Sequence, residues 1–260
     1  AVYDDPERAH GCGAGAPARR LRHHGRTRTA DHDRGRRRAE ARPRDREGLS
    51  RPQGPAEQPG PSPGAPADGS AAKAADEAAF KEALGASPER FAQATADADL
   101  RWPQAIAGFE AILGRSVSGP QTPHTAMLVR RAMADSGLST YAAKTHYKRT
   151  RPFVANSVST CTPADEETLK TDGSYPSGHA AIGWMLGMLF TDLAPEKADA
   201  LLKRGFDHAQ SRVICRVHWQ SDVAAGRLMA SAVYARLQSD PVFKAQRELA
   251  RREMAQGPAR

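Results

Sequence analysis

Long apolar runs are missing from this 260-residue sequence, which also has only three cysteines and few aromatic residues. The longest apolar run, Ala180 to Phe190, is too short to span a bilayer and is closed by the polar pair Thr191-Asp192. No apolar stretch follows Ala1, so no signal peptide is visible in this chain. We therefore expect a soluble protein without membrane spans.

The scarcity of cysteine leaves the redox compartment open. Cys12 lies in a segment that we do not expect to fold, which leaves Cys161 and Cys215 as a candidate pair. A disulfide between them would fit an oxidising compartment, whereas two buried thiols are equally compatible with the sequence.

Apolar side chains are also scarce in residues 1–60, which contain fourteen arginines, nine acidic residues and no lysine, and so carry +5 of the net charge of +8. Such a segment cannot bury enough surface to offset the entropy of ordering it. We predict that residues 1–69, including a Pro/Gly linker from Gly54 to Gly69, are disordered. The rest of the chain is nearly neutral, so the high isoelectric point says little about the folded part.

Two further interpretations concern this basic segment. The run from Arg34 to Arg38 could bind nucleic acid or anionic lipid, but interspersed acidic residues and the lack of aromatic stacking partners disfavour nucleic acid. Its Arg/Pro/Gly/Ala bias also resembles a GC-rich stretch translated in the wrong frame, which is a hypothesis about its origin.

Alternating strand patterns are almost absent after residue 69, and the chain there has the pattern of successive helices. We predict one all-α domain over residues 70–256, without internal repeats. The expected helices cover residues 71–84, 89–113, 123–136 with Gly137 as the stop, 138–149, 177–193, 195–213, 222–238 and 241–254. Between Thr150 and Tyr175 lies a loop-rich stretch, and long structured loops are often functional.

The alanine-rich stretches 71–83 and 224–235 could pack between subunits.

Polar groups that a helical bundle does not need gather in three places: KTHYKRTRP, GSYPSGHA and SRVICRVHWQSD. In the second, Pro176 and Ser177 are good helix openers, because Pro lacks an amide hydrogen and Ser caps free donors. Gly178 and His179 do not fit this structural role, since Gly weakens a helix and His adds a titratable ring.

The third motif allows two chemical interpretations. Asp222 could hold one ring nitrogen of His218 protonated and leave the other free as a base or nucleophile. Alternatively, His179, His218 and Asp222 could be three ligands of a metal such as zinc.

Charge favours the first interpretation. If Lys144, Arg151 and Arg212 converge, a cation is repelled, whereas an oxyanion is held by charge-assisted hydrogen bonds. The helix start at Ser177 and Gly178 adds backbone N–H donors and the positive end of the helix dipole. The expected ligand is phosphate.

Together the motifs Lys144-x6-Arg151-Pro152, Pro176-Ser177-Gly178-His179 and Ser211-Arg212-x5-His218-x3-Asp222 match the three-part signature of the type 2 phosphatidic acid phosphatase superfamily. The contexts GSYPSGHA and SRVICRVHWQSDVAAGR resemble the bacterial class A non-specific acid phosphatases, over about Ala65 to Arg251. Two departures stand out. Ala180 replaces a usual Thr, which could alter a hydrogen bond behind the site, and residues 1–60 resemble neither family sequence nor an export signal.

The resemblance implies a role for each matched residue. His218 would form a phosphohistidine, Asp222 would fix its tautomer, and His179 would act as general acid and later as base. Phosphate would be bound by Lys144, Arg151, Ser177, Gly178 and Arg212. No metal or cofactor is implied, phosphate and vanadate are expected as inhibitors, and the substrates would be small phosphomonoesters of broad range. Transfer to other hydroxyls, a periplasmic or secreted location and a homo-oligomer would be compatible with this family.

Rival functions come from the same site and from another class. A vanadium-dependent haloperoxidase would use the same oxyanion cradle to hold vanadate as a cofactor, although such proteins are generally longer. The membrane-bound lipid phosphatases need spans that this chain lacks. A nucleic-acid-binding module carried by the Arg-rich segment is the alternative of another class. His124, His146 and His208 lie outside the signature, and we expect them at the surface or in packing.

Overall fold

The computed structural model describes residues 63–256. The predictions made for residues 1–62, namely disorder, the Arg-rich binding segment and the wrong reading frame, lie outside the described residues, as does Cys12. The chain leaves an irregular stretch and enters its first helix at Ser70, whose hydroxyl accepts a hydrogen bond of 3.2 Å from the backbone N–H of Lys73.

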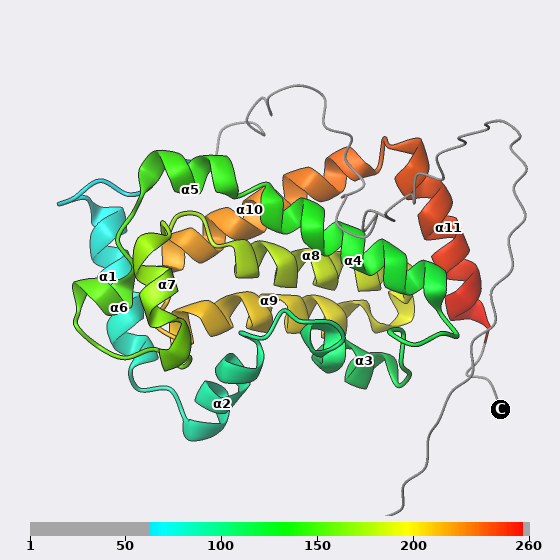
Figure 1. Cartoon of the computed structure of the whole chain (residues 1–260), viewed down its shortest axis with the longest axis horizontal. Coiled ribbons are helices and arrows are strands. Elements are labelled where there is room, and N and C mark those ends of the chain that lie inside the picture. The colour runs from blue at the N-terminus through cyan, green and yellow to red at the C-terminus, as the bar shows by residue number, and fades with distance from the viewer. Residues whose placement is uncertain (1–62, 257–260) are drawn as a thin grey trace, which may run out of the picture. The chain divides into compact units, whose positions relative to one another are not determined.

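The described residues are all-α, as predicted, and contain no strand (Figure 1). The α-helices are α1 (Ala71–Ala83), α2 (Pro88–Ala96), α3 (Ala107–Leu113), α4 (Pro123–Leu138), α5 (Tyr141–Tyr147), α6 (Pro152–Ala155), α7 (Glu166–Thr171), α8 (Gly178–Leu193), α9 (Ala198–Ile214), α10 (Gln220–Leu237) and α11 (Pro241–Ala255). Short 3-10 turns precede three of them, η2 (Gln104–Ile106), η3 (Pro163–Asp165) and η4 (Pro195–Lys197).

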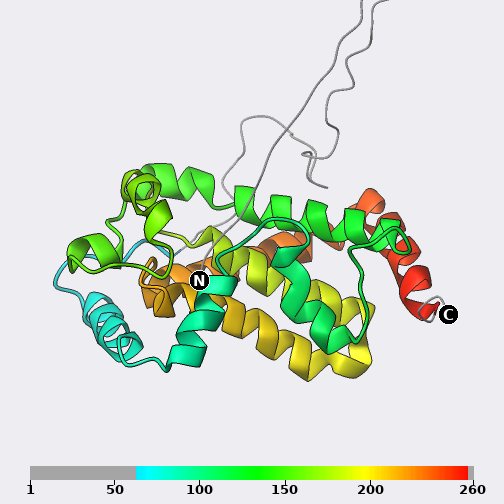
Figure 2. The ribbon, with the colours of Figure 1, turned by 60° about the horizontal axis from the view of Figure 1, so that its bottom comes forward.

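The apolar helix α8 forms the centre of the fold and packs on α9, α10 and α4. Figures 1 and 2 both show α8 and α9 side by side along their length. Glycines permit this closeness, because a Cβ on Gly205 would lie only 2.9 Å from the carbonyl oxygen of Gly183 and from Cα of Gly187. The backbones of α8 and α9 are therefore in close contact at these glycines.

Two features of the predicted helix pattern were wrong for a physical reason that the structure shows. Gly137 does not stop α4, which continues to Leu138, and a Cβ at Gly137 would press on Ile182 of α8 at 3.2 Å. This glycine serves the contact between two helices instead of a turn. The helix expected over 89–113 is broken between α2 and α3, where Pro103 lacks the amide hydrogen that a helix interior needs.

The loop-rich stretch between α5 and α8 is structured by short helices and by a disulfide. Cys161 is bonded to Cys215 at the end of α9, with their Cα atoms 4.8 Å apart. The question that the sequence left open is thus decided in favour of the disulfide. The bridge fixes this loop to the helix that carries Arg212.

The alanine-rich stretch of α10 has one buried and one exposed side. Ala225 and Ala230 of α10 are buried inside the chain, whereas Ala224 and Ala232 are exposed and free to face a subunit, so the homo-oligomer stays a prediction. From residue 63 to residue 256, no helix combines the length and apolarity needed to cross a bilayer.

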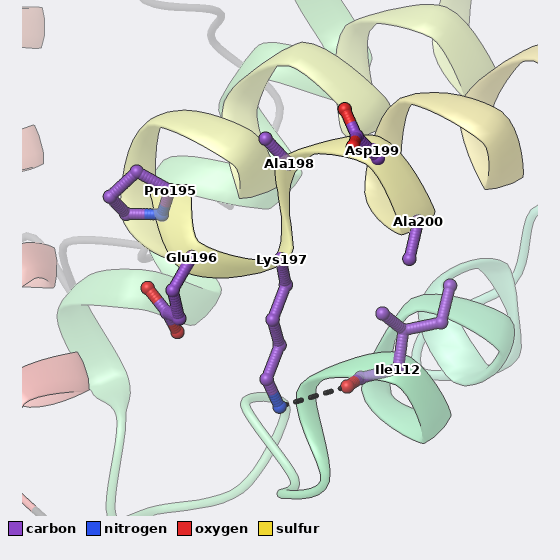
Figure 3. A pocket seen from close by; sticks show the side chains of 7 residues that line it. All are labelled: Ile112, Pro195, Glu196, Lys197, Ala198, Asp199 and Ala200. Carbon is purple, nitrogen blue, oxygen red and sulfur yellow. Dashed lines mark hydrogen bonds between the residues drawn. The ribbon is translucent and has the colours of Figure 1, made fainter.

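A surface pocket of about 620 Å³ lies at the turn between α8 and α9 (Figure 3). Its lining comprises Ile112, Pro195, Glu196, Lys197, Ala198, Asp199 and Ala200. The amine of Lys197 donates hydrogen bonds of 3.0 and 2.6 Å to the carbonyl oxygens of Ile112 and Leu113. Lys197 thus caps the carboxyl end of α3, and the pocket contains none of the residues of the three polar motifs.

Candidate active site

The three polar motifs meet where the amino ends of α8 and α10 come together. The backbone N–H of Ser177, which caps α8, donates to the carbonyl oxygen of Asp222 in the first turn of α10 over 3.0 Å. Arg151, just before α6, lies 3.1 Å from the ring of His218, and Lys144 of α5 contacts the same carboxylate of Asp172 as Arg151 does. Residues far apart in sequence therefore form one buried site.

The buried ring of His218 lies between a cation and a carboxylate. Its Nε2 lies 3.1 Å from Nη1 of Arg151, and its Nδ1 lies 3.5 Å from Oδ2 of Asp222. Because a guanidinium can only donate, Nε2 must be the accepting nitrogen and Nδ1 carries the hydrogen. Burial, with the charges of Arg151 and Lys144, holds the pKa of His218 well below its ordinary value. The ring is neutral, with its lone pair on Nε2.

Asp222 is fully buried and accepts from several donors. Its carboxylate receives hydrogen bonds from the Trp219 backbone N–H over 2.8 Å, from Nη1 of Arg149 over 2.6 Å and from the Ser174 hydroxyl. Burial raises the pKa of Asp222, and the charge of Arg149 and these hydrogen bonds oppose that rise. The carboxylate is thereby fixed on the Nδ1 side of His218.

Lys144 and Arg151 share the carboxylate of Asp172. Oδ2 of Asp172 lies 2.8 Å from Nη2 of Arg151 and 3.4 Å from Nζ of Lys144, whose amine also donates to the carbonyl oxygen of Gly173 over 2.6 Å. Burial, with repulsion from Arg151, lowers the pKa of Lys144 to about 8. Two cationic groups are thus held together next to His218 at the cost of their hydration.

Arg212, in the last turn of α9, is buried, yet its Nε and Nη1 have no hydrogen-bond partner within the described part of the chain. Burial and the charge of Arg151 lower its pKa to about 10. Buried donors are nearly always paired, and an unpaired guanidinium beside other cations is suited to bind an oxyanion.

The amino end of α8 supplies the remaining predicted groups. Ser177 caps the helix by accepting from the N–H of Ala180 over 3.2 Å, and Gly178 and His179 form its first turn. Nε2 of the half-buried His179 lies 3.2 Å from the carbonyl oxygen of Ala98. Burial, with the charge of Arg212, holds the pKa of His179 well below its ordinary value.

Comparison with known proteins agrees with this geometry. Residues 125–240 match the model of the PAP2 superfamily. Over 170 residues the chain is 44% identical to a non-specific acid phosphatase of Salmonella typhimurium, covering 65% of this chain and 68% of that protein. A non-specific acid phosphatase of Providencia stuartii is 42% identical over 168 residues (64% and 68% covered), and an acid phosphatase of Zymomonas mobilis is 40% identical over 165 residues (64% and 62% covered).

The chain is an acid phosphatase of the PAP2 superfamily. In this phosphatase the structure brings all eight residues singled out from the sequence to one region, although their individual roles remain predictions. These residues are Lys144, Arg151, Ser177, Gly178, His179, Arg212, His218 and Asp222.

The sequence did not identify three polar residues of the acid phosphatase site, Arg149, Ser174 and Asp172. Arg149 stands in KTHYKRTRP between Lys144 and Arg151, Ser174 stands in GSYPSGHA before Ser177, and both donate to Asp222. Asp172 directly precedes GSYPSGHA, and no sequence signal marks it. The sequence cannot show whether Arg149 or Arg151 faces the carboxylate of Asp222, because this depends on the conformation of the loop that carries them.

Metal binding is the alternative interpretation of His179, His218 and Asp222. Among residues 63–256, no group of three or more His, Cys, Asp and Glu side chains is arranged to hold a metal ion. His124 and His146 of this phosphatase are exposed, whereas His208 is buried against Gly183, and burial lowers its pKa to about 4.

Proposed function

We propose that this acid phosphatase hydrolyses phosphomonoesters of broad range through a phosphohistidine on His218, without a metal ion. The observation that supports this most is the placement of the neutral ring of His218, with Nε2 towards the cations and Nδ1 towards buried Asp222. A phosphoryl group bound by those cations would meet the lone pair of Nε2, and the ring would stay oriented by the carboxylate.

In the first step Nε2 attacks phosphorus in line, the N–P bond forms, and the bond from phosphorus to the leaving oxygen breaks. The ring becomes cationic, and Asp222 stabilises that charge. Lys144, Arg151 and Arg212, with the amino end of α8, bind the three equatorial oxygens, where charge is spread in the transition state. Before the attack, Arg151 must exchange its contact with Nε2 for one with a phosphoryl oxygen, which frees the lone pair of Nε2.

His179 supplies the proton for the leaving oxygen and later takes a proton from the water that attacks phosphorus and breaks the N–P bond. Burial and the charge of Arg212 disfavour protonated His179. A phosphate dianion bound among the same groups opposes their charge, so substrate binding itself raises the proton affinity of His179.

In this proposal Lys144, Arg151, Arg212 and the amino end of α8 contact only the phosphoryl group of the substrate. This supports a broad substrate range and also transfer of the phosphoryl group to hydroxyls other than water. Phosphate and vanadate should inhibit, because both present tetrahedral or trigonal oxyanions to the same cations. The disulfide between Cys161 and Cys215 supports a periplasmic or secreted location, since such bonds persist in oxidising compartments.

Rapid quenching with p-nitrophenyl phosphate tests this proposal. We expect a phosphorylated protein that is stable in alkali and labile in acid, as phosphohistidine is, and that is absent from His218→Ala. The matched control is His146→Ala, which changes an exposed histidine of α5 and should behave as wild type.

Three outcomes would contradict the proposal. A His218→Ala variant that still forms the phosphoprotein would refute the assignment of His218 as the nucleophile, and loss of activity on dialysis against EDTA would refute metal independence. Bromide oxidation with added vanadate in place of hydrolysis would favour the haloperoxidase.

A further inference from the structure

Arg149 lies between two buried carboxylates. Its Nη1 donates to Oδ1 of Asp222 over 2.6 Å, and its Nη2 donates to Oδ2 of Asp76 over 2.7 Å. All three side chains are nearly inaccessible, with exposed fractions of 9% for Arg149, 2% for Asp76 and 0% for Asp222. A chain of alternating charges therefore runs from α1 to the carboxylate behind His218.

Asp76 is anchored to α10 as well as to Arg149. It accepts 2.7 Å and 2.6 Å hydrogen bonds from the backbone N–H and the hydroxyl of Ser221, the residue directly before Asp222. The Ser221 hydroxyl is also 2.8 Å from Nη1 of Arg149. Asp76 of α1 thus binds both Ser221 at the start of α10 and the guanidinium of Arg149, which in turn donates to Asp222.

Trp219 completes this arrangement. Its ring lies under the guanidinium of Arg149, 5.5 Å from ring centroid to Cζ, and contacts Phe80 of α1 with centroids 5.9 Å apart. Its backbone N–H donates to Asp222. Arg149 is therefore held in place by ring packing as well as by two ion pairs.

The charge of Asp76 determines how Arg149 affects Asp222 during the reaction. Asp222 must offset the positive charge that His218 gains on phosphorylation, but a cation bound to Asp222 weakens its field at the ring. Asp76 neutralises Arg149, so the guanidinium orients Asp222 without cancelling its charge. Without Asp76, Arg149 would pair with Asp222 alone, and the cationic ring would lose part of its stabilisation.

We propose that Asp76 and Arg149 are positioning residues that act through Asp222 to favour phosphorylation of His218. This inference rests on the proposed phosphohistidine, and it extends the working site to α1, which lies outside residues 125–240 that match the superfamily model. Neither residue contacts the phosphoryl group in this assignment. Their contribution is to the rate of the chemical step.

The test compares Asp76→Asn with the matched control Glu77→Gln, one position further along α1. Glu77 is exposed and forms an ion pair of 2.8 Å with Lys73. The first-turnover rate of phosphoprotein formation with p-nitrophenyl phosphate, the dissociation constant of inorganic phosphate and the thermal midpoint are measured for each. We expect phosphorylation to slow about 10-fold in Asp76→Asn, the scale of loss for residues that orient an active group, with phosphate affinity unchanged. Glu77→Gln should match wild type in all three.

The outcomes separate the inference from the function on which it rests. A lower thermal midpoint with a wild-type phosphorylation rate per folded molecule would mean that Asp76 is only structural, and would overturn the inference. Absence of any phosphohistidine in wild type would overturn the proposed function itself and the inference with it. If Asp76→Asn does not fold, Arg149→Lys decides, because a lysine keeps the charge but lacks the planar fork whose two nitrogens each contact one carboxylate. A slowed phosphorylation there supports the positioning role, and a wild-type rate refutes it.

Discussion

Gly226 of α10 lies directly against the backbone carbonyl of Ser177, so that a Cβ at position 226 would overlap the carbonyl oxygen and press on Ala180 at 3.3 Å. This contact, one turn after Asp222, lets α10 approach the amino end of α8. The hydrogen bond between Ser177 and Asp222 depends on the same closeness. A glycine without any chemistry of its own therefore joins two of the three polar motifs.

We expect Gly226→Ala to separate these motifs. Alanine is normally the better helix residue, but here the overlap should destabilise the fold by about 1–3 kcal/mol, as overpacked sites do, and should reduce phosphatase activity more than the unfolded fraction explains. Urea unfolding and steady-state kinetics measure the two effects. The matched control is Gly119→Ala, where an added Cβ meets nothing within 4 Å. Full activity in Gly226→Ala would contradict this account of the contact.

A second prediction concerns the pH dependence of anion binding. With a pKa of about 8, lowered from 10.5 mainly by burial, Lys144 loses its charge as the pH rises through 8. The dissociation constant of inorganic phosphate should then rise by roughly tenfold per pH unit above 8, since the charged form is the one that binds. Lys144→Arg keeps its charge over this range and should remove that rise. An unchanged pH profile in Lys144→Arg would show that Lys144 does not control binding.

A third prediction tests the role of His179 through the leaving group. Without a general acid, hydrolysis should slow by about 10²–10⁴-fold for alkyl phosphates, whose alkoxide leaves poorly. p-Nitrophenyl phosphate should be affected far less by His179→Ala, because p-nitrophenolate leaves without a proton. The ratio of kcat/KM for glycerol phosphate to that for p-nitrophenyl phosphate is measured. An equal loss on both substrates would assign His179 to binding rather than to proton transfer.

A fourth prediction concerns the disulfide. Cys161 and Cys215 are 54 residues apart in sequence, and opening a loop of that length should cost about 4 kcal/mol by the chain-entropy account. The double variant Cys161→Ser/Cys215→Ser should unfold at a lower urea midpoint, while kcat at low temperature stays near wild type. Dithiothreitol should destabilise wild type and leave the double variant unchanged. Equal stability of both proteins would mean that the bridge contributes nothing.

Much of the candidate site was readable from the sequence, because its chemistry is carried by residue types at short fixed spacings. His218 and Asp222 stand four residues apart at a helix start, which places both near one helix end whatever the rest of the fold does. Pro176 and Ser177 likewise predict the start of α8 from local capping alone. The all-α class followed from helix-period apolar patterns and the lack of alternating ones.

Helix packing and long-range ion pairs became known only from the tertiary structure, because short sequence patterns carry no information about them. Gly137 looks like a helix stop, yet its lack of a side chain serves the packing of α4 on α8. Asp76 and Arg149 are 73 residues apart, and nothing near either residue in the sequence announces their ion pair. The sequence by itself indicated the residues that we propose bind and transfer phosphate, since they stand at the short spacings of a known family signature. Only the folded chain determined the disulfide, the partners of Asp222 and the pKa of Lys144, because burial and long-range contacts set them.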